Sequence, residues 1–218
     1  MSTHTTVPET LLNDDSHKVL RNTYFLLSLT LMVSAGAAAV AMMSGLGHLG
    51  AMGFMLLGFV LLFVIQKTAR TAQGLGWVFA FTACLGASVG PMLSNYFSLE
   101  NGAAMVLQAL GGTAFIFFAL SAYVLTSRKN FSFLGGFLMI GFLVAVIAML
   151  ASIFLQLPAL NLAISALIIL LMSGFILYDT SNIIHGGETN YVLATVSMYL
   201  NVFNIFTSLL QLIGLLDD

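Results

Sequence analysis

The chain has 218 residues, of which 60% are hydrophobic and only 6% are charged, with a formal net charge of −2. A soluble domain carries about 25% charged residues, so this chain cannot cover a folded core with a soluble surface. The composition excludes an ordinary soluble enzyme and predicts no nucleic-acid partner. It indicates an integral membrane protein whose surroundings are the lipid bilayer.

The N-terminal segment is polar and lacks the apolar run that a cleavable signal peptide needs. We therefore expect an uncleaved first membrane helix that follows a cytoplasmic tail over residues 1–22. Within this tail, Met1–Ser16 is predicted to be disordered because it is long and polar. The transmembrane domain is predicted over residues 23–216, and residues 217–218 form the C-terminal end.

Seven apolar segments follow the tail, and each is close to the roughly 20 residues that cross the hydrocarbon core as a helix. Polar, basic or glycine-containing breaks separate them. The predicted fold class is an all-α membrane protein with seven transmembrane helices. The predicted helices are Tyr24–Met43, Gly47–Ile65, Leu75–Leu93, Ala103–Leu125, Phe133–Phe154, Leu160–Ile184 and Tyr191–Leu216.

The basic residues all fall on one side of this seven-helix arrangement. They are Lys18, Arg21, Lys67, Arg70, Arg128 and Lys129. Loops rich in Lys and Arg stay in the cytoplasm, so the N-terminus is predicted to be cytoplasmic and the C-terminus periplasmic. A re-entrant last segment would instead return the C-terminus to the cytoplasm.

Asp179 is the single acidic residue within a predicted membrane helix, since the other seven acids lie in the tail, the loops or the C-terminal end. An aspartate at the centre of such a helix costs about 2.5–3.5 kcal/mol, and intramembrane carboxyl groups are therefore candidate functional groups. Asp179 either lies near the cytoplasmic end of the sixth helix and reaches water, or is buried and shares a proton with Asn201 or Asn204. The second alternative makes it a candidate gate in a protonation-dependent latch.

The last predicted helix carries a polar seam at spacings of four, three, four and three residues. At about 100° per residue its members share an arc of roughly 80°. The seam either forms hydrogen bonds between helices or lines a partly hydrated path with Asp179 as its ionisable group. Its members are Ser197, Asn201, Asn204, Ser208 and Gln211.

Catalytic and metal-binding patterns are weak, so we predict no enzyme, no metal site and no cofactor. The four histidines lie in tails or at segment ends, and Cys84 is the sole cysteine. Gly86–Gly90 fits the G-x-S-x-G pattern of serine hydrolases, but Ser88 has no general base nearby in the sequence. We interpret Gly86 and Gly90 as a helix-packing face, with a kink at Pro91. An aspartyl protease would need a second intramembrane carboxyl group.

Nearly the whole chain resembles the Bax inhibitor-1 family, also called the TMBIM family. The family-like stretches are Gly174–Thr180 and Tyr199–Phe206, and further similarity to protease-modulating bacterial members lies in His17–Leu31, Phe131–Gly136, Phe154–Leu160 and Ser181–Tyr191. The resemblance implies a seven-helix fold in which the last helix is packed within a bundle of the other six. It also implies a bacterial inner-membrane protein that associates with the AAA protease FtsH and restrains degradation of membrane proteins.

One position departs from the pattern of family members that leak calcium in a proton-sensitive way. Those members use two aspartates, of which the first corresponds to Asp179 and the second to Asn201. An amide cannot carry a second negative charge, and calcium usually takes several oxygen ligands that include carboxylates. The sequence therefore favours the protease modulator over the alternative, a proton-sensitive cation (calcium) leak with Asp179 as gate.

Overall fold

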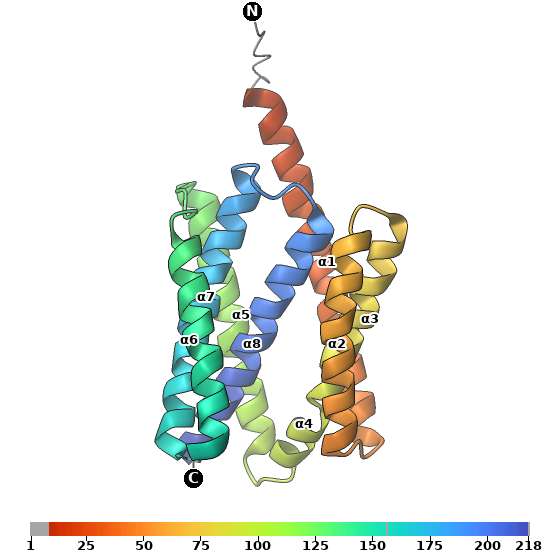
Figure 1. Cartoon of the computed structure of the whole chain (residues 1–218), viewed down its shortest axis with the longest axis vertical. Helices are drawn as coiled ribbons and strands as arrows, with labels where there is room; N and C mark the ends of the chain where they lie inside the picture. Colours follow the sequence, from red (N-terminus) through yellow and green to blue (C-terminus); the bar gives the residue numbers. More distant parts are fainter. Residues whose placement is uncertain (1–8, 156, 218) are drawn as a thin grey trace, which may run out of the picture.

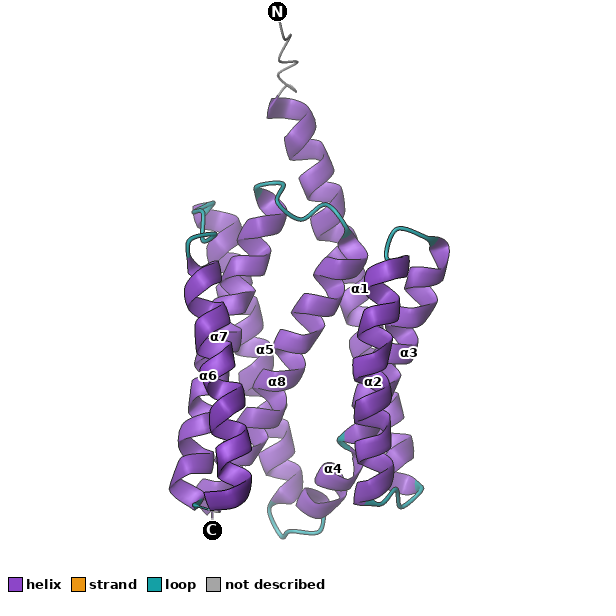
Figure 2. Cartoon of the chain, in the orientation of Figure 1, coloured by secondary structure: helices purple, strands orange, loops and turns teal. Residues whose placement is uncertain are grey.

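A computed structural model describes residues 9–155 and 157–217, and all its regular structure is α-helical. Seven helical stretches in these residues are long and apolar enough to cross a membrane, as predicted. The helices run up and down between two ends at which the loops gather (Figure 2). They are α1 (Glu9–Met43), α2 (His48–Thr68), α3 (Ala72–Ser88), α4 (Gly90–Phe97), α5 (Gly102–Ser127), α6 (Leu134–Leu155), α7 (Pro158–Ile184) and α8 (Tyr191–Asp217).

The first helix is longer than predicted. It begins at Glu9 rather than Tyr24, so residues 9–16 are helical and the prediction of disorder there was wrong. Residues 1–8 lie outside the described part of the chain. The stretch from Glu9 to Ala35 contains no glycine or proline. Once the membrane span is helical, each added residue gains a hydrogen bond without a new nucleation cost, so a polar sequence can extend it.

The third crossing consists of two helices rather than one. The chain breaks at Val89 between α3 and α4, and α4 continues to Phe97, beyond the predicted end at Leu93. Pro91 explains the break, because its ring lacks an N–H and clashes with the carbonyl four residues earlier. A methyl group at Gly86 would collide with the backbone of Ser34, so this glycine allows close packing of α3 on α1.

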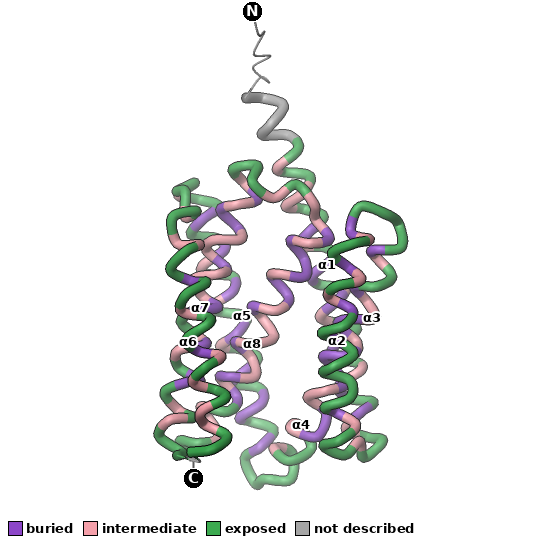
Figure 3. The backbone as a smooth tube through the Cα atoms, viewed as in Figure 1, coloured by how far each residue is buried: buried purple, intermediate pink, exposed green. Residues whose placement is uncertain are grey.

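Helix α8 forms the centre of the bundle. It packs directly against α7, α5, α1 and α3, while α2 packs on α3 and α6 packs on α7 at the outside. Figure 3 shows the contrast, with buried positions along α8 and exposed positions along most of α6. The side chains of Met198, Tyr199, Ile205 and Leu210 are fully buried. The prediction of a last helix within a bundle of the other six is therefore confirmed.

One end of the bundle gathers the basic segments. The connections α2–α3 and α5–α6 and the loop between α7 and α8 lie at the end from which α1 projects (Figure 1). The connections hold Arg70, Arg128 and Lys129. The tip of α8 lies at the opposite end. We call the end from which α1 projects the loop-rich end. Asp179 lies near this end, because it is close to the end of α7 at Ile184.

Candidate functional site at the junction of α7 and α8

Asp179 contacts the polar seam of α8. Its Oδ2 atom accepts hydrogen bonds from Ser197 Oγ at 2.6 Å and from Asn201 Nδ2 at 2.7 Å. Ser197 and Asn201 are four residues apart and therefore share one face of α8. Asn201 is 4% exposed. One carboxyl oxygen of α7 therefore holds two side chains on the same face of α8, which joins the two helices at this point.

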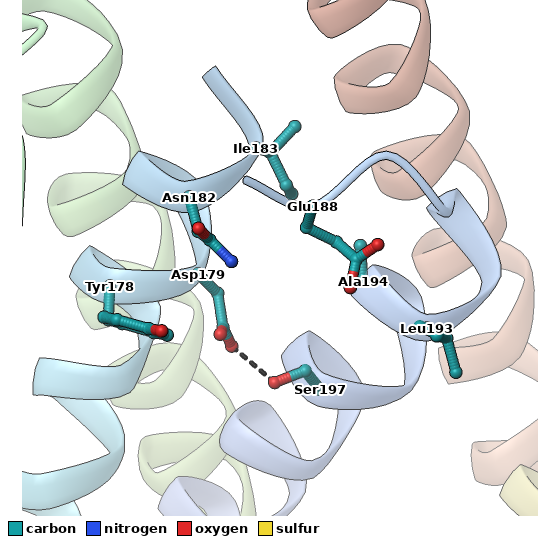
Figure 4. Close-up of a pocket in the computed structure, with 8 residues that line it drawn as sticks. All are labelled: Tyr178, Asp179, Asn182, Ile183, Glu188, Leu193, Ala194 and Ser197. Carbon is teal, nitrogen blue, oxygen red and sulfur yellow. Dashed lines mark hydrogen bonds between the residues drawn. The ribbon is translucent and has the colours of Figure 1, made fainter. Parts of the chain in front are cut away.

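A cavity of about 210 Å³ adjoins this contact. It lies between the end of α7, the first turns of α8 and the loop that joins them, with Asp179 at its wall (Figure 4). Asp179 is thus neither fully buried nor simply at the surface, because α8 holds one carboxylate oxygen while the side chain also faces the cavity. The lining residues are Tyr178, Asp179, Asn182, Ile183, Glu188, Leu193, Ala194 and Ser197.

Glu188 brings a second carboxyl group to the cavity from the loop. Glu188 and Asp179 both line this cavity. The Glu188 Oε1 atom accepts a hydrogen bond of 2.7 Å from the backbone N–H of Asn190, which fixes the carboxylate at the cavity wall. Two acids of different origin therefore meet here, one from a membrane span and one from a loop.

The other members of the predicted seam do not reach Asp179. Asn204 donates to the carbonyl of Leu200 in its own helix at 2.8 Å, and Ser208 is buried farther along α8. Gln211 is exposed, and its Oε1 accepts a hydrogen bond of 3.3 Å from Ser165 of α7. The structure therefore joins Ser197, Asn201 and Gln211 to α7 by hydrogen bonds between the two helices.

Sequence reasoning missed two polar contacts of α8. The buried Tyr199 hydroxyl hydrogen-bonds Ser34 Oγ of α1 at 2.7 Å and donates to the Thr82 carbonyl of α3 at 3.3 Å. Asn190 Oδ1 accepts from the N–H groups of Val192 and Leu193 and so caps the start of α8. The cap had a visible signal, because asparagine is a preferred residue just before a helix. The Tyr199 contact had none, since both its partners are remote in sequence.

No cluster of three or more His, Cys, Asp or Glu side chains that suits a metal ion occurs in residues 9–155 and 157–217. The junction itself brings together two carboxyl groups with hydroxyl and amide neighbours. Such a site can bind or release protons, form a polar contact between helices, or attract a positive charge.

Comparison with known proteins decides the family. Residues 16–218 match the family model described as inhibitor of apoptosis-promoting Bax1. The chain belongs to the Bax inhibitor-1 family. Its relatives include the modulator of FtsH protease YccA of Escherichia coli K12, which is 55% identical over 91% of this chain and 90% of the relative.

Other bacterial proteins are similar to this chain over almost the same length. The inner membrane protein YccA of Escherichia coli O6:H1 is 55% identical over 91% of this chain and 90% of its own. An uncharacterized membrane protein of Vibrio cholerae is 46% identical over 94% of this chain and 92% of its own. The family-like stretches Gly174–Thr180 and Tyr199–Phe206 lie on α7 and α8, the two helices that form the junction.

Proposed function

We propose that this protein is a bacterial inner-membrane regulator that associates with the FtsH protease and restrains degradation of membrane proteins. The observation that carries the proposal is 55% identity over 91% of the chain to a relative named modulator of FtsH protease. The relative named inner membrane protein supports the location, and the seven apolar helices are compatible with it. We infer regulation by binding rather than catalysis.

The N-terminal part of α1 offers a physical means of contact with a cytoplasmic ATPase. This helix projects beyond the loop-rich end of the bundle (Figure 1). The concentration of Lys and Arg at that end favours its placement in the cytoplasm, because basic loops are retained there. A projecting helical arm on the cytoplasmic side would be accessible to the protease without disturbance of the bundle.

The half-life of a membrane substrate of FtsH in cells tests the proposal. We would compare no added protein, the wild type, Asp179→Asn and a deletion of residues 1–16. The wild type should lengthen the half-life, and Asp179→Asn should retain this effect because protease binding does not require a titrating carboxyl group. Loss of the effect in the deletion would assign the contact to the arm. An unchanged half-life with the wild type contradicts the proposal.

A soluble substrate of the same protease serves as a control. Its half-life should change less than that of the membrane substrate, because we propose restraint at the membrane. A reporter fused after Asp218 tests the orientation separately. Periplasmic signal is expected from seven crossings with a cytoplasmic N-terminus, and cytoplasmic signal contradicts the orientation.

The alternative function is a proton-sensitive cation leak gated by Asp179. One observation favours it: Glu188 supplies a second carboxyl group to the Asp179 cavity, although Asn201 replaces the family's second aspartate. In liposomes, a leak would appear as calcium flux that depends on pH and falls on Asp179→Asn. Flux equal to that of empty liposomes at every pH would exclude this alternative without affecting the first proposal.

A further inference from the structure

Asn190 joins the ends of two helices that are far apart in the sequence. Its side-chain oxygen accepts hydrogen bonds from the N–H groups of Val192 at 2.9 Å and Leu193 at 3.4 Å, at the start of α8. Its side-chain nitrogen donates to the carbonyl of Ala69 at 3.0 Å, just after the end of α2. One amide group therefore caps both helix ends.

This double cap has a clear physical basis. Helix ends leave backbone N–H and C=O groups without partners inside the helix, and a buried group without a partner is unfavourable. Ala69 is only 6% exposed, so water is an inefficient substitute there. A side-chain amide has both an acceptor and donors. Aspartate and serine can cap the start of α8, but aspartate has no donor and serine is too short to keep both contacts.

The same residue fixes two walls of the Asp179 cavity. Its backbone N–H holds the carboxylate of Glu188, and its side chain holds the N–H of Leu193. Glu188 and Leu193 both line the cavity. The first half of the loop bonds back to α7, through the N–H groups of Gly187 and Glu188 to the Asn182 carbonyl. Among the hydrogen bonds of the described residues, only Asn190–Ala69 joins residues 185–190 to a part of the chain other than α7 and α8.

We propose that Asn190 is a strap that ties the α7–α8 loop to the end of α2 and thereby restricts access to the Asp179 cavity from the loop-rich end. Release of the bond to Ala69 frees the loop that carries Glu188. The cavity then opens to the aqueous side while α8 itself stays capped. The proposal concerns access to Asp179 and holds whether or not the protein restrains a protease.

Thiol accessibility tests the strap. The chain has a single cysteine, so Cys84→Ala provides a cysteine-free background. Ala194→Cys places a reporter on the cavity wall, at a position that is 4% exposed. The full chain in lipid nanodiscs is treated with a water-soluble maleimide. Labelling rates are compared for Asn190, Asn190→Asp and Asn190→Ser, since both variants retain the cap of α8 and lose the bond to Ala69.

Both variants should label about twofold to tenfold faster, the population change that corresponds to one lost hydrogen bond. The neighbouring exposed residue supplies the matched control, Thr189→Ala, which should leave the rate unchanged. A second reporter, Ala145→Cys in the buried face of α6, should also be unchanged. Unchanged labelling at the Ala194→Cys reporter overturns the strap. Faster labelling in Asn190→Asp alone also overturns it, because that result would reflect the added charge. Equal acceleration at both reporters overturns it too, because that result would reflect a general loosening of the bundle.

Discussion

Helices α6 and α8 both cross the membrane, yet they use their side chains in opposite ways. Helix α6 exposes large apolar side chains, among them Phe137 at 69% and Ile140 at 66%. Helix α8 buries Tyr199 and Ile205 completely and carries polar side chains between them. Figure 3 shows α6 as largely exposed, whereas most positions of α8 are buried or intermediate. The more apolar helix therefore lies outside and the more polar one inside.

This arrangement reverses the pattern of a soluble protein, and the solvent explains it. Lipid chains are as apolar as leucine, so burial of α6 would gain little, while exposure of the α8 amides to hydrocarbon would be unfavourable. Within the bundle, Asn201 finds Asp179 and Tyr199 finds Ser34. Polarity along a membrane helix is therefore a guide to its place in the bundle.

Truncation of an aromatic residue should give the largest difference in the free energy of unfolding between the two helices. Tyr199→Ala on α8 removes a buried ring that packs edge-on against Phe81 and stacks on Phe203. We expect a loss of about 3–5 kcal/mol in the free energy of unfolding, as for large aromatic residues in packed cores. Phe137→Ala on α6 should change it by less than about 1 kcal/mol. Unfolding in mixed micelles measures both, and similar losses would contradict the contrast.

A carboxyl group placed on α6 should be tolerated less well than Asp179 is tolerated on α7. Val144 is 52% exposed and lies near the middle of α6. Val144→Asp should weaken membrane insertion of this helix by about 2.5–3.5 kcal/mol, because a carboxyl group at the middle of a membrane helix is unfavourable in hydrocarbon. An insertion assay on the α6 segment gives the value. Val144→Asn is the uncharged control, and insertion of Val144→Asp equal to that of the wild type would contradict the expected cost of a carboxyl group in α6.

The two asparagines of the α8 seam should differ in their contribution to the free energy of unfolding. Asn201→Leu leaves the Asp179 carboxyl with Ser197 as its remaining donor on α8, so we expect a loss of about 1–2 kcal/mol. Asn204→Leu should cost less, about 0.5 kcal/mol, because Asn204 bonds only a carbonyl of its own helix. Mixed-micelle unfolding compares them directly. A larger loss for Asn204→Leu would contradict the contact with Asp179.

A methyl group added to a glycine should give the smallest difference in the free energy of unfolding between α8 and α6. On Gly214 of α8, the new carbon would lie 2.5 Å from the Tyr96 hydroxyl oxygen, whereas on Gly136 of α6 it would meet no atom within 4 Å. Gly214→Ala should therefore cost about 1 kcal/mol, with the ring of Tyr96 displaced. Gly136→Ala should be neutral or slightly stabilising, since alanine favours a helix. Stabilisation by Gly214→Ala would show that the ring yields freely.

The fold was largely predictable and the site only in part. The apolar segments predicted seven spans because their lengths match the hydrocarbon core, and the family resemblance indicated the central place of the last helix. The kink near Pro91 was also predictable, because a proline disrupts a helix through its own ring. The extension of α1 to Glu9 was missed, because polarity does not prevent propagation of a helix that is already formed. At the site, the periodicity of α8 identified Ser197 and Asn201 as candidates but not their shared acceptor atom.

By itself, then, the sequence determined the class of protein, the spans, the intramembrane acid and the polar face of α8. These are properties of composition and period, which depend on neighbours along the chain. Only the tertiary structure decided that Asp179 meets Ser197 and Asn201, that Glu188 shares its cavity, and that Asn190 reaches Ala69. Those contacts depend on how helices rotate and cross, which long-range packing sets and local pattern does not.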